Sequence, residues 1–126
     1  MKERDKLVMS VRETIPNINV DCSSELESFQ NKTLRPILKF QNDLTLSILK
    51  STKGYEQLKG KEHLENFHIH LKSFLDKNIK LKNQIVSSVT ALFTQEELIF
   101  YFAHNKAISK RIISMQFKRF ADEMGE

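Results

Sequence analysis

Apolar residues recur along this chain at the three- and four-residue spacing of amphipathic helices, and no stretch shows the alternation typical of a strand. Near the N-terminus this spacing gives a narrow stripe of Leu7, Val8, Val11 and Ile15. Pro16 follows, and a proline disfavours helical backbone at the residue before it. We therefore expect a first helix that ends before Pro16, and a connecting loop over the polar residues 17–23.

A second helix is predicted to begin at Ser24, because Ser24 and Glu27 have the S-x-x-E spacing of a capping box. One apolar face continues from there and comprises Leu26, Phe29, Ile37, Phe40, Leu44 and Ile48. Pro36 falls inside this pattern and cannot donate a backbone hydrogen bond, which predicts a kink around residues 32–35. Because the face keeps its phase across Pro36, we expect a kinked helix that ends near Gly54.

The longest periodic segment covers residues 61–93. Its apolar positions are Leu64, Phe67, Leu71, Phe74, Leu75, Ile85, Val86, Val89, Leu92 and Phe93. They share one phase over about eight helical turns, which favours one long helix. Asn78 and Lys82 interrupt the stripe, however, and Asp76 could cap a new start, so two helices remain the alternative.

The stretch after Phe93 raises the question of a catalytic carboxylate pair. Thr94 and Glu97 form a second capping-box pattern, and adjacent Glu96 and Glu97 would diverge by about 100° on a helix, so we expect a cap and no acid/base pair. The next five residues are apolar on every side of the helix, which predicts that they are buried or lie in an interface. These possible interface residues are Leu98, Ile99, Phe100, Tyr101 and Phe102.

A last helix is expected over residues 106–124, with apolar residues around about half of its circumference. Together the patterns predict an all-α fold, a compact single-domain bundle of about five or six helices spanning residues 1–126. With only 3 Gly and 2 Pro in 126 residues, the chain has little material for the turns of a β fold. The length suits one domain with one core.

The formal net charge of +4 arises from 20 basic and 16 acidic residues that are interspersed, as on a solvated surface. Lys110, Arg111 and Lys118 share one side of the last predicted helix and are the candidates for phosphate contacts. No aromatic residue lies among them to stack on bases, so a solvated helix face is the simpler interpretation.

No catalytic, cofactor or metal site is predicted. Glu65 and His68 form a single E-x-x-H pattern, whereas a di-iron bundle needs two copies and further glutamates. His63 and His70 are two helical turns apart, too far to bind one ion. Cys22 is the only cysteine and has no activating partner nearby.

The chain shows no secretory signal, and its longest apolar run, five residues, is far short of the roughly 20 that span a bilayer. A single cysteine fits a reducing compartment. A cytoplasmic protein without membrane contact is therefore expected.

Residues 29–43 resemble a small family of uncharacterised helical proteins from Bacteroidetes-type bacteria. The likeness continues through residues 92–97 and 110–113, at matching spacing. Ser87 and Ala91 stand where related chains tend to carry glycines. Some members bear the name glyoxalase, but metal glyoxalases of the βαβββ type need strands and a His/Glu ligand set. The resemblance implies a cytoplasmic helical protein and no reaction.

The surplus of apolar surface on residues 98–102 and on the last helix favours a non-enzymatic interaction module that associates with itself as a homodimer. The alternative is a nucleic-acid-associated protein that uses the Lys110, Arg111 and Lys118 face. An enzyme ranks third, and the sequence names no partner or ligand.

Overall fold

The computed structural model describes residues 1–12 and 24–124, and these are all-α, with no strand. The predicted fold class is thereby confirmed. Residues 13–23, which hold Ile15, Pro16, the expected loop and Cys22, lie outside the described part. The first half has α1 (Lys2–Ser10), α2 (Glu25–Phe29), the π-helix η1 (Gln30–Leu34), α3 (Arg35–Phe40), α4 (Asn42–Ser51) and α5 (Tyr55–Lys59). The second half has α6 (Phe67–Lys77), α7 (Ile79–Thr90), α8 (Gln95–Ala103) and α9 (Asn105–Met124).

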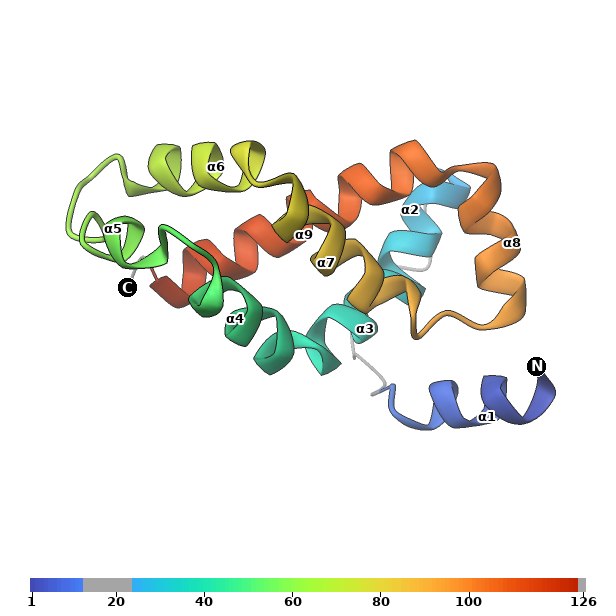
Figure 1. The fold of residues 1–126 in the computed structure, drawn as a ribbon. Helices are drawn as coiled ribbons and strands as arrows, with labels where there is room; N and C mark the ends of the chain where they lie inside the picture. The colour runs from blue at the N-terminus through green and yellow to red at the C-terminus, as the bar shows by residue number, and fades with distance from the viewer. Residues whose placement is uncertain (13–23, 125–126) are drawn as a thin grey trace.

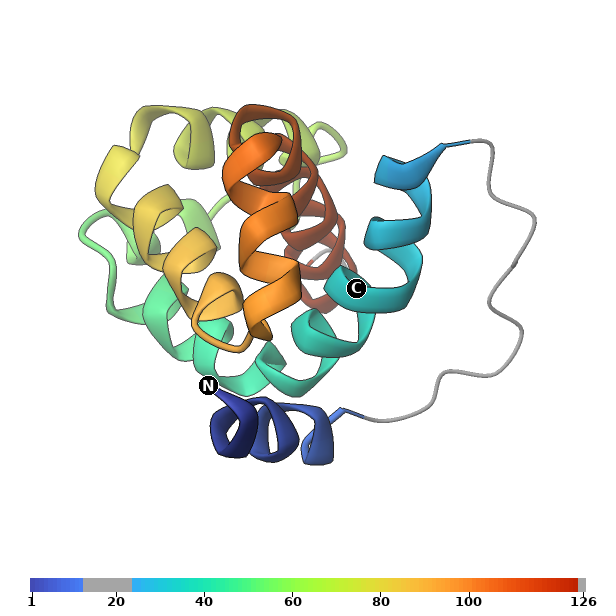
Figure 2. The same cartoon turned by 90° about the vertical axis from the view of Figure 1, so that its right-hand side faces the viewer.

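The twenty-residue helix α9 runs through the middle of the molecule, and η1, α6, α7 and α8 pack against it (Figure 1). Helices α4 and α5 cover the side of α7 and α6 that α9 leaves open. Helix α1 lies at the same end of the molecule as α8, as both views show (Figures 1 and 2).

The core is built on one stripe of α9, where Ile108, Ile112, Gln116 and Phe120 recur every fourth residue and are fully buried. Four-residue spacing keeps these side chains on one face of the helix. The opposing side chains of the core are apolar and also fully buried: Leu34, Ile37, Leu38, Leu71, Ile85, Val89 and Phe93.

The helix is not broken at Pro36, but its buried face does not keep the same direction on the two sides of Pro36. The chain stays helical from Glu25 to Phe40, but the turn directly before Pro36 widens into η1, where the Arg35 N–H donates to the Gln30 carbonyl. A wider turn relieves the clash between a proline ring and the carbonyl of the preceding turn. The extra residue in this turn rotates the helix face.

That rotation overturns part of the predicted stripe. Phe40 and Leu44 were expected in the core, but they are 51% and 46% exposed. A further break at Gln41, whose φ is −87° and ψ is 4°, separates α3 from α4. Ile37 of the predicted stripe is fully buried, and it is joined in the core by Leu34, Leu38, Thr45 and Leu49, which the stripe did not include.

The long segment 61–93 forms two helices, so the favoured single helix is wrong. Asn78 leaves helical geometry, with φ −105° and ψ 84°, and its side-chain amide donates to the Phe74 carbonyl at 2.9 Å. Asparagine can satisfy helix-end carbonyls in this way, which stabilises the break. The stripe then resumes with Leu81, six residues after Leu75, and residues 61–66 form turns that precede α6.

These breaks explain why the described residues hold nine α-helical segments and one π-helix, more than the five or six expected. The expected helix end near Gly54 is confirmed, since α4 ends at Ser51, and Gly54 has φ 95°, in the left-handed region that favours glycine. It lies two residues beyond the C-cap Thr52, and a Cβ there would stand 3.2 Å from Phe74. None of the described helices is both long enough and apolar enough to cross a bilayer.

Gln116 is a polar residue of the core, and we expect it to lower the stability of the folded protein. The Gln116 amide is fully buried, and neither its Nε2 nor its Oε1 has a hydrogen-bond partner in the described part of the chain. An unpartnered buried amide costs about 1–3 kcal/mol. Gln116→Met should therefore raise the free energy of unfolding by roughly that amount in urea melts. Gln84→Met, at an exposed position, is the control and should change it by less than about 0.5 kcal/mol. A destabilised Gln116→Met protein would contradict the prediction.

Candidate functional site

Helix α8 starts with the capping box that the sequence predicts. The Glu97 N–H donates to Thr94 Oγ1 at 3.3 Å, and the Thr94 N–H donates to Glu97 Oε1 at 2.8 Å. Two helix-end N–H groups are thus satisfied by two side chains. At the other predicted box, the Glu27 N–H donates to Ser24 Oγ at 3.0 Å, so Ser24 caps α2 as expected.

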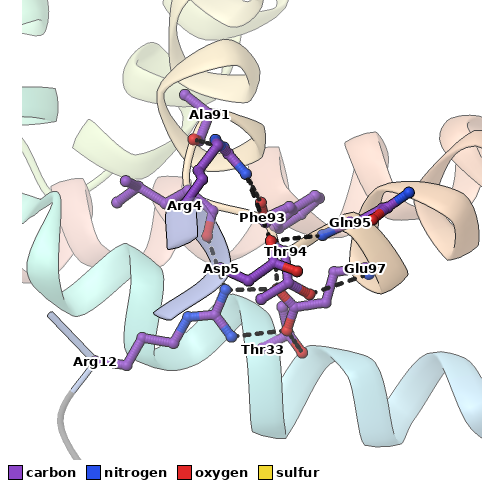
Figure 3. Close-up of polar contacts among 10 residues, drawn as sticks. Arg4, Asp5, Arg12, Thr33, Ala91, Phe93, Thr94, Gln95 and Glu97 are labelled. Atoms are coloured by element: carbon purple, nitrogen blue, oxygen red, sulfur yellow. Dashed lines mark hydrogen bonds and ion pairs between the residues drawn. The ribbon is translucent and has the colours of Figure 1, made fainter. Parts of the chain in front are cut away.

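Glu97 also joins three parts of the fold that are distant in sequence (Figure 3). Arg12, just after α1, donates from Nη1 to Oε2 at 2.7 Å and from Nη2 to Oε1 at 2.5 Å. Thr33 of η1 donates from Oγ1 to Oε2 at 3.0 Å. The Arg12 side chain is only 6% exposed, so this bidentate ion pair is largely shielded from water. We call Arg12, Thr33, Thr94 and Glu97 the Glu97 cluster.

The electrostatics of the Glu97 cluster favour the ionised carboxylate. Burial raises the pKa of Glu97, but the hydrogen bond from Arg12, the backbone hydrogen bond from Thr94, the positive charge of Arg12 and the hydrogen bond from Thr33 lower it by more. The net result is a pKa below the ordinary value. Glu97 is therefore a fixed negative charge at neutral pH.

Two further residues of α1 fasten it to the chain around the start of α8 (Figure 3). Arg4 donates to the carbonyls of Phe93 and Ala91 at 2.6 and 2.5 Å. Asp5 accepts a hydrogen bond of 3.0 Å from the N–H of Gln95, the first residue of α8. A carboxylate at this position also meets the positive end of the helix dipole. Helix α1 is thus held by charged contacts to the α7–α8 turn and the start of α8.

The arrangement argues against an acid/base pair at Glu96 and Glu97. Both Glu97 oxygens accept two hydrogen bonds each, which leaves the carboxylate no free position for a substrate proton. Glu96 is exposed, on a different side of the helix. We conclude that Glu97 serves as the structural link between α1, η1 and α8.

The predicted interface residues of α8 divide into two groups. Phe100 and Tyr101 face inward, with their rings 4.9 Å from Phe29 and 5.8 Å from Phe93, respectively. Leu98 is partly buried against the same core. Ile99 and Phe102 point outward and are 64% and 68% exposed. Of the two predicted possibilities, burial within this chain does not hold for these two residues, because no helix of the described part covers that side of α8.

The three residues predicted as candidate phosphate contacts lie in different surroundings. Lys110 lines a groove between α6, α7 and α9, together with Lys72 and Lys82. Arg111 donates to the side-chain oxygen of Gln30 at 2.7 Å, so its guanidinium already has a partner within the chain. Lys118 is exposed.

No group of three or more His, Cys, Asp or Glu side chains in residues 1–12 and 24–124 could hold a metal ion. Sequence reasoning missed Arg4, Asp5 and Arg12, which anchor α1. The only signal for them was an alternation of charges on the first predicted helix, and nothing there indicated partners more than 80 residues away.

Comparisons with family models, curated proteins and solved structures find no match to this chain. The resemblance of residues 29–43 to a helical bacterial family therefore stays an expectation from the sequence.

We expect the Glu97 cluster to stabilise the folded protein. Arg12→Met removes both charged donors from a shielded carboxylate and should lower the free energy of unfolding by about 1–3 kcal/mol. Lys6→Met, at an exposed position of α1, is the matched control and should change it by less than about 0.5 kcal/mol. Equal effects of the two substitutions in urea melts would contradict the assigned role of Arg12.

A second prediction concerns pH. Because the folded-state pKa of Glu97 is lowered, its stabilising contribution is complete above the unfolded-state pKa of about 4.3 and is lost as pH falls through the folded-state pKa. Between about pH 6 and pH 3, the wild type should lose more free energy of unfolding than Glu97→Gln does. Glu96→Gln should retain the wild-type pH dependence. A Glu97→Gln protein with an unchanged pH slope would disprove this assignment.

Proposed function

We propose that this protein is a non-enzymatic interaction module that forms a homodimer through the outer side of α8. The observation that carries the proposal is the exposure of two large apolar side chains, Ile99 and Phe102, three residues apart on one helix. Residues at this spacing are neighbours on a helix surface, so they form one apolar patch. Association would remove this patch from water.

The net charge of the chain restricts which surface two copies can share. The chain carries a net charge of +4, so two copies repel one another unless they meet through a surface without like charges. The exposed side of α8 meets this requirement, since the patch is flanked by uncharged Gln95 and Ala103 and by one charge of each sign, Glu96 and Lys106. A two-fold axis would place the same apolar residues against each other.

An antiparallel pairing of two α8 helices would add favourable electrostatics. Glu96 lies in the first turn of α8, and Lys106 lies just beyond its C-terminal end; both are exposed. In an antiparallel pair, Glu96 of each copy approaches the end of the helix where the other copy carries Lys106. The opposed helix dipoles also attract.

Helix α8 alone is too short to supply a stable interface. Its nine residues extend roughly 13 Å. A stable interface buries about 800 Å² of surface on each partner, more than one side of so short a helix offers. Figure 2 shows α8 facing the viewer with α1 directly beneath it. Met9 of α1 is exposed and lines a hollow together with Glu96 and Phe100 of α8, so it is the apolar residue that could extend the surface. The Glu97 cluster would hold the two helices in a fixed relation before association, which lowers the entropy cost of binding.

Nucleic-acid binding through Lys110, Arg111 and Lys118 has less support. The Arg111 guanidinium is engaged with Gln30, and Lys110 lies at a groove whose lining is partly apolar, which suits a nucleic-acid backbone poorly. If it occurred, binding to duplex DNA or RNA would weaken steeply with salt.

The test is the oligomeric state, measured by light scattering from about micromolar to millimolar concentration. The wild type should be a dimer, and Phe102→Glu should be a monomer, because dimerisation would bury two carboxylates against each other. Ile79→Glu is the matched control: Ile79 is 69% exposed, on α7, and this variant should remain a dimer. A monomeric wild type at all concentrations, or loss of the dimer in Ile79→Glu, would refute the proposal.

A further inference from the structure

A groove of about 710 Å³ lies where α6, α7 and α9 meet, with Tyr101 of α8 at its edge. About half of its exposed lining is apolar and includes Leu75, Val86, Ile113 and Phe117. Small-molecule sites are commonly concave and between about 300 and 1,000 Å³ in volume. The groove therefore has the size of a site for a small ligand, with apolar side chains that could contact an apolar body.

The rim of this groove is positively charged. Lys72 of α6, Lys82 of α7 and Lys110 of α9 line it, so three separate helices each bring one ammonium group. Lys72 has a partner, Asp76, at 3.5 Å. Lys82 and Lys110 have no ion-pair partner within residues 1–12 and 24–124. The lining thus carries two uncompensated positive charges, which would attract an anionic group.

Two hydroxyl groups on the rim supply a further donor. The Tyr101 hydroxyl and Ser109 Oγ are 3.1 Å apart and share one hydrogen bond, in which either oxygen can be the donor. One bond uses one of the two hydroxyl protons, so the other proton stays available for an acceptor in the groove. An anionic oxygen would be a better acceptor for it than a neutral one.

The groove continues along α6 into a second hollow of about 680 Å³. The two hollows share Lys72, Asp76 and Phe117, so Phe117 lies between them. Ile69 lines the second hollow and is exposed, although its side chain is apolar. An elongated apolar chain that passes over Phe117 would reach Ile69 and remove it from water.

From these contacts we propose that the groove binds a small amphipathic anion, with its charged head at Lys82, Lys110 and the Tyr101–Ser109 hydroxyls and its apolar chain along Phe117 towards Ile69. The head can be a carboxylate or a phosphate ester, since both present anionic oxygens to ammonium and hydroxyl donors. This site is separate from the proposed dimer surface, because Ile99 and Phe102 lie on the outer side of α8.

The test is calorimetric titration of the full chain with decanoate, decyl phosphate and decanol, which share the same ten-carbon chain. Decanoate or decyl phosphate should bind, and the tighter of the two identifies the head group. Added salt should weaken this binding, because the attraction is partly electrostatic. Decanol should bind at least about tenfold more weakly, since it lacks the charge. Equal binding of decanol, or no binding of either anion, would overturn the proposal.

Substitutions locate the site. Lys82→Met and Lys110→Met should each weaken binding of the anion by roughly tenfold. Lys80→Met removes an exposed lysine of the same helix α7 that does not line the groove, and it should leave the affinity unchanged.

Ile69→Ser should weaken binding of the ten-carbon anion by about three- to tenfold through loss of apolar contact. Equal effects of Lys80→Met and Lys82→Met would overturn the site. Ile99→Glu, which also places a charge in the dimer patch but lies away from Tyr101, should bind the anion normally, so this proposal and the dimer proposal can fail independently.

Discussion

The apolar stripe of α9 has to be covered along its whole length, and this requirement determines where the other helices lie. Ile108, Ile112 and Phe120 are fully buried, and the segments that bury them come from η1, α6, α7 and α8. Burial of large apolar side chains is the main favourable term in folding, at roughly 1.5–3 kcal/mol for each one. The charged contacts of α1 and α8 then orient helices that hydrophobic burial has already brought together.

The Glu97 cluster shows what such polar contacts add. An ion pair contributes little net stability when its desolvation cost is counted, but its geometry is specific. Here one carboxylate receives donors from residue 12, from η1 and from the start of its own helix. Only one relative placement of the three elements satisfies all of these donors. The orientation of α8, and therefore of its exposed side, depends on this cluster.

Helix α8 is the element that connects the two proposed surfaces. Its inner side places Tyr101 next to Ser109 at the edge of the groove, while its outer side carries Ile99 and Phe102. The groove combines apolar side chains with uncompensated lysines, whereas the outer patch is apolar and has one charge of each sign at its ends. These chemical differences lead us to assign a small amphipathic anion to the first and a second copy of the chain to the second.

The sequence by itself determined the features that depend on neighbouring residues: the helical class, the caps at Ser24 and Thr94, and the end of a helix near Gly54. Each of these follows from backbone and side-chain chemistry within a few positions. Tertiary structure decided the rest. The phase change before Pro36 and the break at Asn78 depend on which face the core can accept, and the link from Arg12 to Glu97 spans 85 residues. The sequence marked residues 98–102 as apolar on all sides, but only packing against α2 and α9 decided that Phe100 and Tyr101 lie inside while Ile99 and Phe102 stay exposed.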